Sequence, residues 1–256
     1  MKFCQQLLEQ INFLPDRIQS CCATENQLAP SLEFSGGRLN FKKYQDYILN
    51  TFNELQGDSK LCAGCSQLVD IKGDLSIISR DKIRFRYVSI NPHENFCNCK
   101  CVYCNLWSAK NKIVPYAMMP VLQSVFDKGM IYDDATFHWG GGESTILKDF
   151  DEACSFICAN GHRQLLHTNA LQTSKSVIEA LEKNMIDISI SLDSGTPETY
   201  RKVKGVDGFH KVLSTLESYI KAAGSTDVIR IKYIVFEKNN SLSEVKEFIK
   251  ICETLL

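Results

Sequence analysis

Residues 83–104 read IRFRYVSINPHENFCNCKCVYC and carry the most informative pattern in the chain. Residues 83–90 are rich in β-branched and aromatic side chains, as a strand is. Asn91 and Pro92 end this pattern, since proline has no N–H to offer a neighbouring strand. The cysteines that follow are therefore predicted on a loop at the carboxyl end of a strand, the edge where parallel α/β proteins bind ligands.

Four cysteines fall within eight positions of that loop: Cys97, Cys99, Cys101 and Cys104. This spacing is too tight for a set of structural disulfides. Soft thiolates favour zinc or iron–sulfur clusters. Zinc sites usually combine paired cysteines from two separate segments, whereas Cys97, Cys101 and Cys104 form a Cys-x3-Cys-x2-Cys arrangement in one loop. Three thiolates leave one iron of a four-iron cluster without a protein ligand, which is the open position that catalysis needs.

Composition narrows the class of protein. The 256 residues carry a formal net charge of −1, with 44% hydrophobic and 23% charged residues. These values are ordinary for a globular protein and indicate neither a nucleic-acid partner nor a membrane partner. We find no signal peptide, and no apolar stretch approaches the ~20 residues of a membrane span. We therefore expect a cytoplasmic protein, in a reducing compartment where clustered cysteines bind metal or do chemistry.

Strand and helix patterns alternate along the chain after this first strand. Further strands are predicted at residues 135–139, 164–168, 186–192 and 228–236. Helices with apolar positions at a period near 3.6 are predicted at residues 116–128, 147–159, 174–183, 209–223 and 241–255, with a short extra one starting at Pro197. This repetition predicts an α/β fold with a parallel sheet, either open or closed as a partial (β/α) barrel. Five βα units fit between residues 81 and 256, too few for a complete barrel of ~250 residues.

Residues 1–80 do not show the repeated strand and helix patterns of the later residues, and we predict a domain boundary near residue 80. One helix is predicted at residues 41–55, and the rest of this N-terminal region is expected to be irregular. Cys62 and Cys65 form a Cys-x2-Cys pair, which suits half of a zinc site, half of a second cluster, or a redox pair. Other ligands of a second metal would come from Cys4, Cys21 or Cys22.

A run of three glycines, Gly140, Gly141 and Gly142, follows the second predicted strand and precedes Glu143. Glycines at the end of a strand expose backbone N–H and C=O groups and let a ligand approach closely. The adjoining carboxylate can receive an ammonium group. A flexible turn from strand to helix would account for an isolated run of this kind equally well.

Together, the two motifs resemble those of the radical S-adenosylmethionine superfamily. The three-cysteine loop, with Tyr103 before its last cysteine, is similar to that family's cluster motif. Residues 141–143 are similar to its Gly-Gly-Glu motif, which contacts the amino group of S-adenosylmethionine. The resemblance covers roughly residues 83–256 and implies the partial barrel of that family. Tyr103 and residues 140–143 are therefore predicted to contact the cofactor.

The resemblance also implies the chemistry. A [4Fe-4S] cluster on Cys97, Cys101 and Cys104 would chelate S-adenosylmethionine at its open iron. One electron from the cluster would cleave the sulfonium to methionine and a 5′-deoxyadenosyl radical, which takes a hydrogen atom from the substrate. An electron donor such as flavodoxin or ferredoxin is expected, and the substrate would be a peptide or a small molecule. These motifs do not identify the residues that meet the substrate.

Three later residues are assigned to the cofactor pocket by the same resemblance. Asn169 follows the third strand in a turn similar to the family's Thr-Asn-Gly, with Ala170 in place of glycine. Ser191 and Asp193 share one face at the end of the fourth strand, where polar groups suit the ribose hydroxyls. A cation further on could pair with the cofactor carboxylate, although basic residues near a turn are usually solvated. The candidates are Arg201, Lys202 and Lys204.

Three alternatives stay open from the residues alone. Cys99 is not required by the family motif, and it could replace a neighbouring ligand or close the cluster as a fourth one. The chain could instead be a non-catalytic zinc or iron–sulfur protein whose cysteines serve structure or redox sensing. The family barrel has six units and five are predicted here, so the sixth strand is absent, the sequence is truncated, or residues 1–80 supply a replacement.

Overall fold

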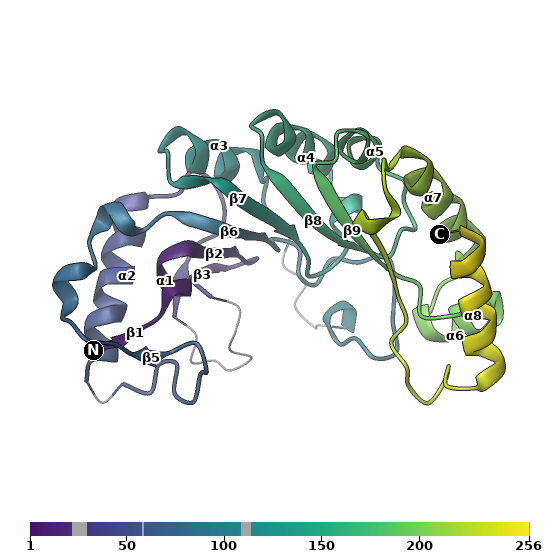
Figure 1. Cartoon of the computed structure of the whole chain (residues 1–256), viewed down its shortest axis with the longest axis horizontal. Helices are drawn as coiled ribbons and strands as arrows, with labels where there is room; N and C mark the ends of the chain where they lie inside the picture. The colour runs from purple at the N-terminus through teal and green to yellow at the C-terminus, as the bar shows by residue number, and fades with distance from the viewer. Residues whose placement is uncertain (22–29, 58, 109–113, 256) are drawn as a thin grey trace. The chain divides into compact units, whose positions relative to one another are not determined.

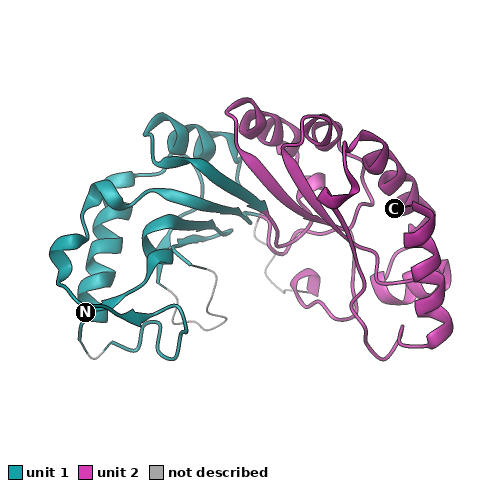
Figure 2. Cartoon of the chain, in the orientation of Figure 1, with its two compact units in different colours: residues 1–92, 116–138 teal, residues 93–115, 139–256 magenta. Residues whose placement is uncertain are grey.

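The computed structural model describes residues 1–21, 30–57, 59–108 and 114–255. The chain forms two compact units, which Figure 2 colours separately. Unit 1 comprises residues 1–92 and 116–138, and unit 2 comprises residues 93–115 and 139–256. Cys22, one of the candidate metal ligands, lies outside the described residues.

In its described residues, unit 1 combines strands with helices (Figure 1). Its strands are β1 Lys2–Phe3, β2 Gln10–Phe13, β3 Arg17–Gln19, β4 Ser31–Glu33, β5 Val69–Asp70, β6 Phe85–Ile90 and β7 Ile131–Trp139. Its helices are α1 Gln5–Glu9, α2 Phe41–Leu55 and α3 Met119–Asp127, with 3-10 turns at Leu75–Ile77 and Arg80–Lys82. The main sheet of this unit has the order β7-β6-β2-β3-β4, and a separate pair joins β1 to β5. β2 is parallel to β6 and antiparallel to β3, which is antiparallel to β4.

Helix α2 packs against β6 and has the bounds that its sequence predicts. Its N-terminus is capped by Asn40, whose side chain accepts a hydrogen bond from the backbone N–H of Lys43 at 3.0 Å. Its buried side chains recur every three or four residues and so line one face. Two of them, Phe41 and Tyr44, meet Phe85 of β6, with ring centroids 6.2 and 5.6 Å apart. Burying each such side chain stabilises the fold by about 1.5–3 kcal/mol.

Strands β2, β3 and β4 are not predicted by the sequence pattern. Each has only three or four residues, and all four residues of β2 are buried, so no alternation marks it. The side chain of Asn12 in β2 accepts a hydrogen bond from the Asn91 side chain at 2.9 Å, which offsets the cost of burying a polar group. Residues 1–80 therefore add strands to the sheet beside the first predicted strand. The predicted boundary near residue 80 stays a prediction.

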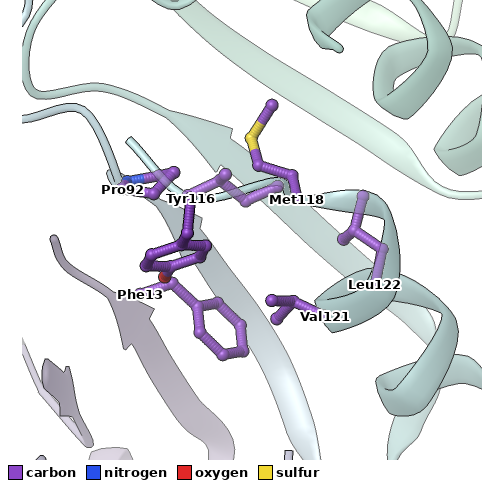
Figure 3. Close-up of a pocket in the computed structure, with 7 residues that line it drawn as sticks. Phe13, Pro92, Tyr116, Met118, Val121 and Leu122 are labelled. Carbon is purple, nitrogen blue, oxygen red and sulfur yellow. The ribbon is translucent and has the colours of Figure 1, made fainter. Parts of the chain in front are cut away.

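A small apolar pocket lies in unit 1 (Figure 3). The phenol oxygen of Tyr116 is buried and has no hydrogen-bond partner among the described residues. The remaining lining is hydrophobic, without the convergent polar groups that orient a ligand. We therefore assign this pocket to core packing. It is lined by Phe13, Ile90, Pro92, Tyr116, Met118, Val121 and Leu122.

Unit 2 repeats a strand–helix pattern (Figure 1). Its strands are β8 Arg163–Thr168, β9 Ile186–Ser191 and β10 Ile229–Lys232. Its helices are α4 Phe150–Ala159, α5 Lys175–Glu182, α6 Pro197–Lys204, α7 Phe209–Ala222 and α8 Leu242–Leu255, with 3-10 turns at Leu106–Ser108, Ser144–Ile146 and Thr226–Val228. β8 and β10 both pair in parallel with β9, and α4, α5 and α7 lie along one side of these strands. The predicted α/β fold with parallel strands is confirmed.

Side-chain caps begin two of these helices, at the positions where the sequence predicts that a helix starts. Ser174 accepts a hydrogen bond from the backbone N–H of Val177 at 3.2 Å, and Thr196 accepts one from that of Thr199 at 3.3 Å. Strand β10 is shorter than the predicted 228–236. It ends at Lys232, and the backbone N–H of Ile234 beyond it donates to the Asp193 side chain instead of to a neighbouring strand. None of the helices in the described ranges is both long and apolar enough to cross a membrane.

Candidate functional site

The cysteine loop belongs to unit 2, and its four cysteines differ in exposure. Cys97, Cys101 and Cys104 are partly exposed, whereas Cys99 is 1% exposed. The neighbouring Cys99 lowers the pKa of Cys97 and lowers that of Cys101 to about 6, and the Lys204 charge adds to the latter effect. The same two contacts, with burial, raise the pKa of Cys99. The pKa of the buried Cys99 is thus raised, whereas those of two of the predicted ligands are lowered.

Backbone hydrogen bonds hold this loop against the C-terminal end of α6. The N–H of Lys100 donates to the carbonyl of Lys204 at 2.8 Å, and that of Val102 donates to Val203 at 2.9 Å. Gly205 ends the helix with φ +67°, and a Cβ there would lie 2.8 Å from the Lys100 carbonyl oxygen. A glycine is needed at this position both for the left-handed conformation and for the close approach.

The glycine run contacts the same loop. Gly140 follows β7, and Gly141 has φ +81°. A Cβ on Gly142 would lie only 2.1 Å from the Phe96 carbonyl oxygen, which is too close for any side chain. The backbone N–H of Glu143 donates a hydrogen bond to the same Phe96 carbonyl oxygen at 2.9 Å. Gly142 thus lets residues 141–143 lie directly against the cysteine loop.

The Glu143 carboxylate is 1% exposed and is surrounded by donors. Its Oε1 accepts from the hydroxyls of Thr145 and Thr168, each at 2.8 Å, and its Oε2 accepts from the backbone N–H of Asn169 at 2.7 Å. Burial raises the pKa of this carboxyl, and the hydrogen bonds oppose the increase. The carboxylate therefore joins the end of β8 to the glycine run. Its predicted contact with an ammonium group stays a prediction.

Asn169 connects β8 to the cysteine loop. Its side-chain Nδ2 donates to Asn98 Oδ1 at 2.7 Å and approaches Cys97 Sγ at 3.8 Å, while its Oδ1 accepts from the N–H of Leu171 at 2.9 Å. Ala170 has φ +56°, the left-handed region that glycine adopts without strain. This explains why the resembled motif has glycine at that position.

Tyr103 and Asp193 are brought together, along with one residue whose role the sequence does not reveal. Asp193 is fully buried, and its Oδ2 accepts hydrogen bonds from the Tyr103 hydroxyl at 2.5 Å and from Lys204 Nζ. Lys204 is 1% exposed and also donates to the Tyr103 hydroxyl at 2.9 Å. The sequence leaves Lys204 either solvated or paired with the cofactor carboxylate, whereas the structure buries it and pairs it with Asp193 and Tyr103. The helical spacing could have indicated that Lys204 is buried, because it shares one face of α6 with the buried Tyr200 and Val203.

Asp193 also determines where β10 ends. Its Oδ1 accepts from the backbone N–H of Ile234 at 2.7 Å, and its carbonyl accepts from the Asn239 side chain at 2.9 Å. Asn239 also accepts a hydrogen bond from the backbone N–H of Phe236 and donates one to the carbonyl of Ile234, so these backbone groups bond to side chains and not to a neighbouring strand. Ser191 is half-buried at the end of β9, opposite Lys232.

The donor set fits an iron–sulfur cluster with one open iron. Three partly exposed thiols lie on one loop whose backbone is anchored on both sides, and the fourth thiol is buried. Among the described residues, no group of three or more His, Cys, Asp or Glu side chains is arranged to hold a single metal ion. A four-iron cluster spans more widely spaced sulfurs, because each thiolate binds a different iron atom.

The chain also matches a known protein family. The sequence model of the Radical SAM superfamily matches residues 91–250, which is more than half of the chain. The chain therefore belongs to the radical S-adenosylmethionine superfamily.

Curated relatives include a probable GTP 3′,8-cyclase of Saccharolobus islandicus, 24% identical over 160 residues that cover 62% of this chain and 50% of the relative. A second, from Thermococcus kodakarensis, is 28% identical over 130 residues, covering 49% of this chain and 41% of the relative. The chain thus spans about half the length of the curated relatives it matches.

Solved structures show the same fold. The structure of anSMEcpe with bound AdoMet matches with a TM-score of 0.52 and 22% identity, over 66% of this chain and 48% of that one. Streptococcus suis SuiB bound to precursor peptide SuiA also matches with a TM-score of 0.52, at 15% identity, over 98% of this chain and 60% of that one. These likenesses support the partial-barrel fold of the family.

Proposed function

We propose that this chain is a radical S-adenosylmethionine enzyme in which Cys97, Cys101 and Cys104 hold a [4Fe-4S] cluster. The observation that carries the proposal is the arrangement of three partly exposed thiols on a loop that the glycine run and the end of β8 contact. The bound cluster would supply one electron to the sulfonium of S-adenosylmethionine, yielding methionine and a 5′-deoxyadenosyl radical that takes a hydrogen atom from the substrate. The reducing cytoplasm is the compartment that suits such a site.

The chain's own residues would bind and orient the cofactor. Backbone groups of residues 140–142 would receive its amino group, as would the Glu143 carboxylate. Asn169 and Ser191 would meet its polar atoms at the ends of β8 and β9. Asp193 differs from Asn169 and Ser191, because one of its carboxylate oxygens already accepts hydrogen bonds from Lys204 and Tyr103. We propose that Asp193 positions Tyr103 and the loop, and that any contact with the ribose uses its remaining lone pairs.

The substrate class that we propose is a peptide or a small molecule, with flavodoxin or ferredoxin as electron donor. Curated relatives are named as cyclases of GTP, and one structural neighbour was solved with a precursor peptide. We also propose that Cys62 and Cys65 take part in a second metal site, since both lie in unit 1 near further thiols.

Anaerobic reconstitution with iron and sulfide tests the main proposal. The reduced protein should show an electron paramagnetic resonance signal of a four-iron cluster that changes when S-adenosylmethionine is added. A variant with Cys97, Cys101 and Cys104 all changed to alanine should lose that signal, whereas Cys252→Ala, on α8, should keep it. A colourless protein whose stoichiometric zinc depends on these three cysteines would sink the proposal.

A further inference from the structure

His93 is a buried histidine to which the proposed function gives no role. It lies at the start of the cysteine loop, shortly before Cys97, and its side chain is completely buried. Its Nε2 atom lies 3.0 Å from the hydroxyl oxygen of Ser144, and the two atoms share a hydrogen bond. Ser144 is also completely buried and directly follows Glu143. This side-chain bond therefore connects the start of the cysteine loop to the residues that follow the glycine run.

Further contacts join the same two segments. The backbone N–H of Phe96 donates to the His93 carbonyl at 2.7 Å, so residues 93–96 form a tight turn. The Phe96 carbonyl in turn accepts the N–H of Glu143 at 2.9 Å. A Cβ on Gly142 would lie only 2.5 Å from the His93 carbonyl oxygen, so this glycine packs directly on the turn. Residues 142–144 are thus held against the turn by a close contact, a backbone bond and the His93 side chain.

Packing alone does not account for a histidine at this position. Burial lowers the pKa of His93 to about 4, so the ring is neutral at pH 7, with one nitrogen as donor and the other as acceptor. The Nδ1 atom is buried and has no hydrogen-bond partner among the described residues, which costs free energy. An apolar side chain of similar size would avoid that cost but could not bond to Ser144. The bond at Nε2 is therefore the feature that a histidine contributes here.

The separation of these two segments matters for the cofactor that we propose. Cys97, Cys101 and Cys104 would hold the cluster, and residues 140–143 would receive the amino group of S-adenosylmethionine. Both segments would therefore contact one ligand. Such a ligand binds tightly only when the separation of the segments is already correct, because moving them costs binding free energy.

We propose that His93 is a positioning residue for S-adenosylmethionine, which through Ser144 holds residues 142–144 at the separation from the cysteine loop that the cofactor needs. The inference rests on the proposed function, because it assigns a role in binding the same cofactor. His93 acts through Ser144 and not by contact with the cofactor. Its loss should weaken cofactor binding without removing the cluster.

The test compares His93→Leu, Ser144→Ala and the double variant with the unaltered chain after anaerobic reconstitution with iron and sulfide. S-adenosylmethionine is added stepwise, and the change in the electron paramagnetic resonance signal of the reduced cluster gives the half-saturating concentration of the cofactor. Each single variant should raise that concentration about fivefold to tenfold, which is the loss expected for one buried hydrogen bond. The double variant should raise it no further, because both changes remove the same bond.

Control variants separate positioning from a general loss of structure. His93→Gln can still bond to Ser144 through its amide, so its half-saturating concentration should stay within about twofold of that of the unaltered chain. His210→Leu removes an exposed histidine of α7 and should change nothing. All variants should contain the same amount of iron before the cofactor is added. Iron loss in His93→Leu and Ser144→Ala, with an unaltered response from the remaining cluster, would make the role structural and overturn the proposal.

A second measurement needs neither cluster nor cofactor. In the metal-free chain, hydrogen–deuterium exchange of the Glu143 N–H, which donates to the Phe96 carbonyl, reports whether residues 142–144 stay against the turn. Exchange should be about fivefold to tenfold faster in Ser144→Ala and His93→Leu than in His210→Leu. Equal exchange in all three would refute the positioning of this segment by His93. A missing four-iron signal in the unaltered chain would instead refute the proposed function, and the exchange rates would still decide whether His93 holds the segment.

Discussion

Lys204→Met removes a buried positive charge and leaves its partner, Asp193, in place. Both side chains are almost completely buried, at 1% and 0% exposure. The substitution keeps the length and apolar stem of the side chain, so it changes the charge with little change in volume. The Tyr103 hydroxyl also loses the hydrogen bond that Lys204 donates at 2.9 Å.

The expected cost follows from what remains around Asp193. Removing one partner of a buried ion pair typically costs about 3–5 kcal/mol, because the other charge is left without compensation. Here Asp193 keeps the Tyr103 hydroxyl at 2.5 Å and the Ile234 N–H at 2.7 Å as donors. We therefore expect the lower end of that range, about 3 kcal/mol in the free energy of unfolding. With an m-value of up to about 3 kcal/mol per molar urea, the midpoint should fall by about 1 M or more.

The assay is urea unfolding of the metal-free protein under reductant, followed by far-ultraviolet circular dichroism. The matched control is Lys175→Met, which removes an 85% exposed cation 3.6 Å from Glu179 and should cost less than about 0.5 kcal/mol. The double variant with Asp193→Asn should recover part of the loss, because no unpaired charge stays buried. A cost for Lys204→Met below about 1 kcal/mol, equal to that of an exposed pair, would refute the reasoning.

Gly142→Ala should lower iron incorporation and stability, since its Cβ would meet a backbone oxygen of the cysteine loop at 2.1 Å. Gly224→Ala, which meets nothing within 4 Å, is the control, and equal iron content in both variants would contradict the packing argument. Burial lowers the pKa of His93 from 6.5 to about 4, so between these values only the unfolded state takes up a proton and stability falls as pH falls. This protonation lowers the free energy of unfolding by about 2 kcal/mol at pH 5. Urea titrations between pH 4 and 6.5 should show that the free energy of unfolding depends less on pH in His93→Gln than in the unaltered chain. Cys99→Ala should retain the reconstituted cluster, whereas Cys101→Ala should lose it, as iron and sulfide analysis will show. Loss of iron in Cys99→Ala would make Cys99 a ligand.

Elements with a clear local pattern are predicted from the sequence. Helix α2 matches its expected position because its buried residues recur at the helical period, and β6 and β9 lie where runs rich in β-branched or aromatic residues predict strands. The caps at Ser174 and Thr196 are local as well, since donor and acceptor lie three residues apart. Such features depend on neighbours in the chain and so can be read from it.

Elements that depend on distant partners are not predicted. Strand β2 has no alternation, because both of its faces are buried. The early end of β10 depends on Asp193 and Asn239, side chains that take up the backbone groups of the residues that follow it. A propensity scale contains no information about either effect.

The candidate site divides in the same way. The spacing of Cys97, Cys101 and Cys104 and the glycine run before Glu143 are covalent patterns, so the sequence by itself identified the family and its expected cluster. Only the tertiary structure paired Lys204 with Asp193 and Tyr103, residues up to 101 positions apart. The reason is physical: ligand spacing within one loop is limited by the reach of the chain, whereas the partner of a buried charge or thiol is chosen by which segments the folded core brings together.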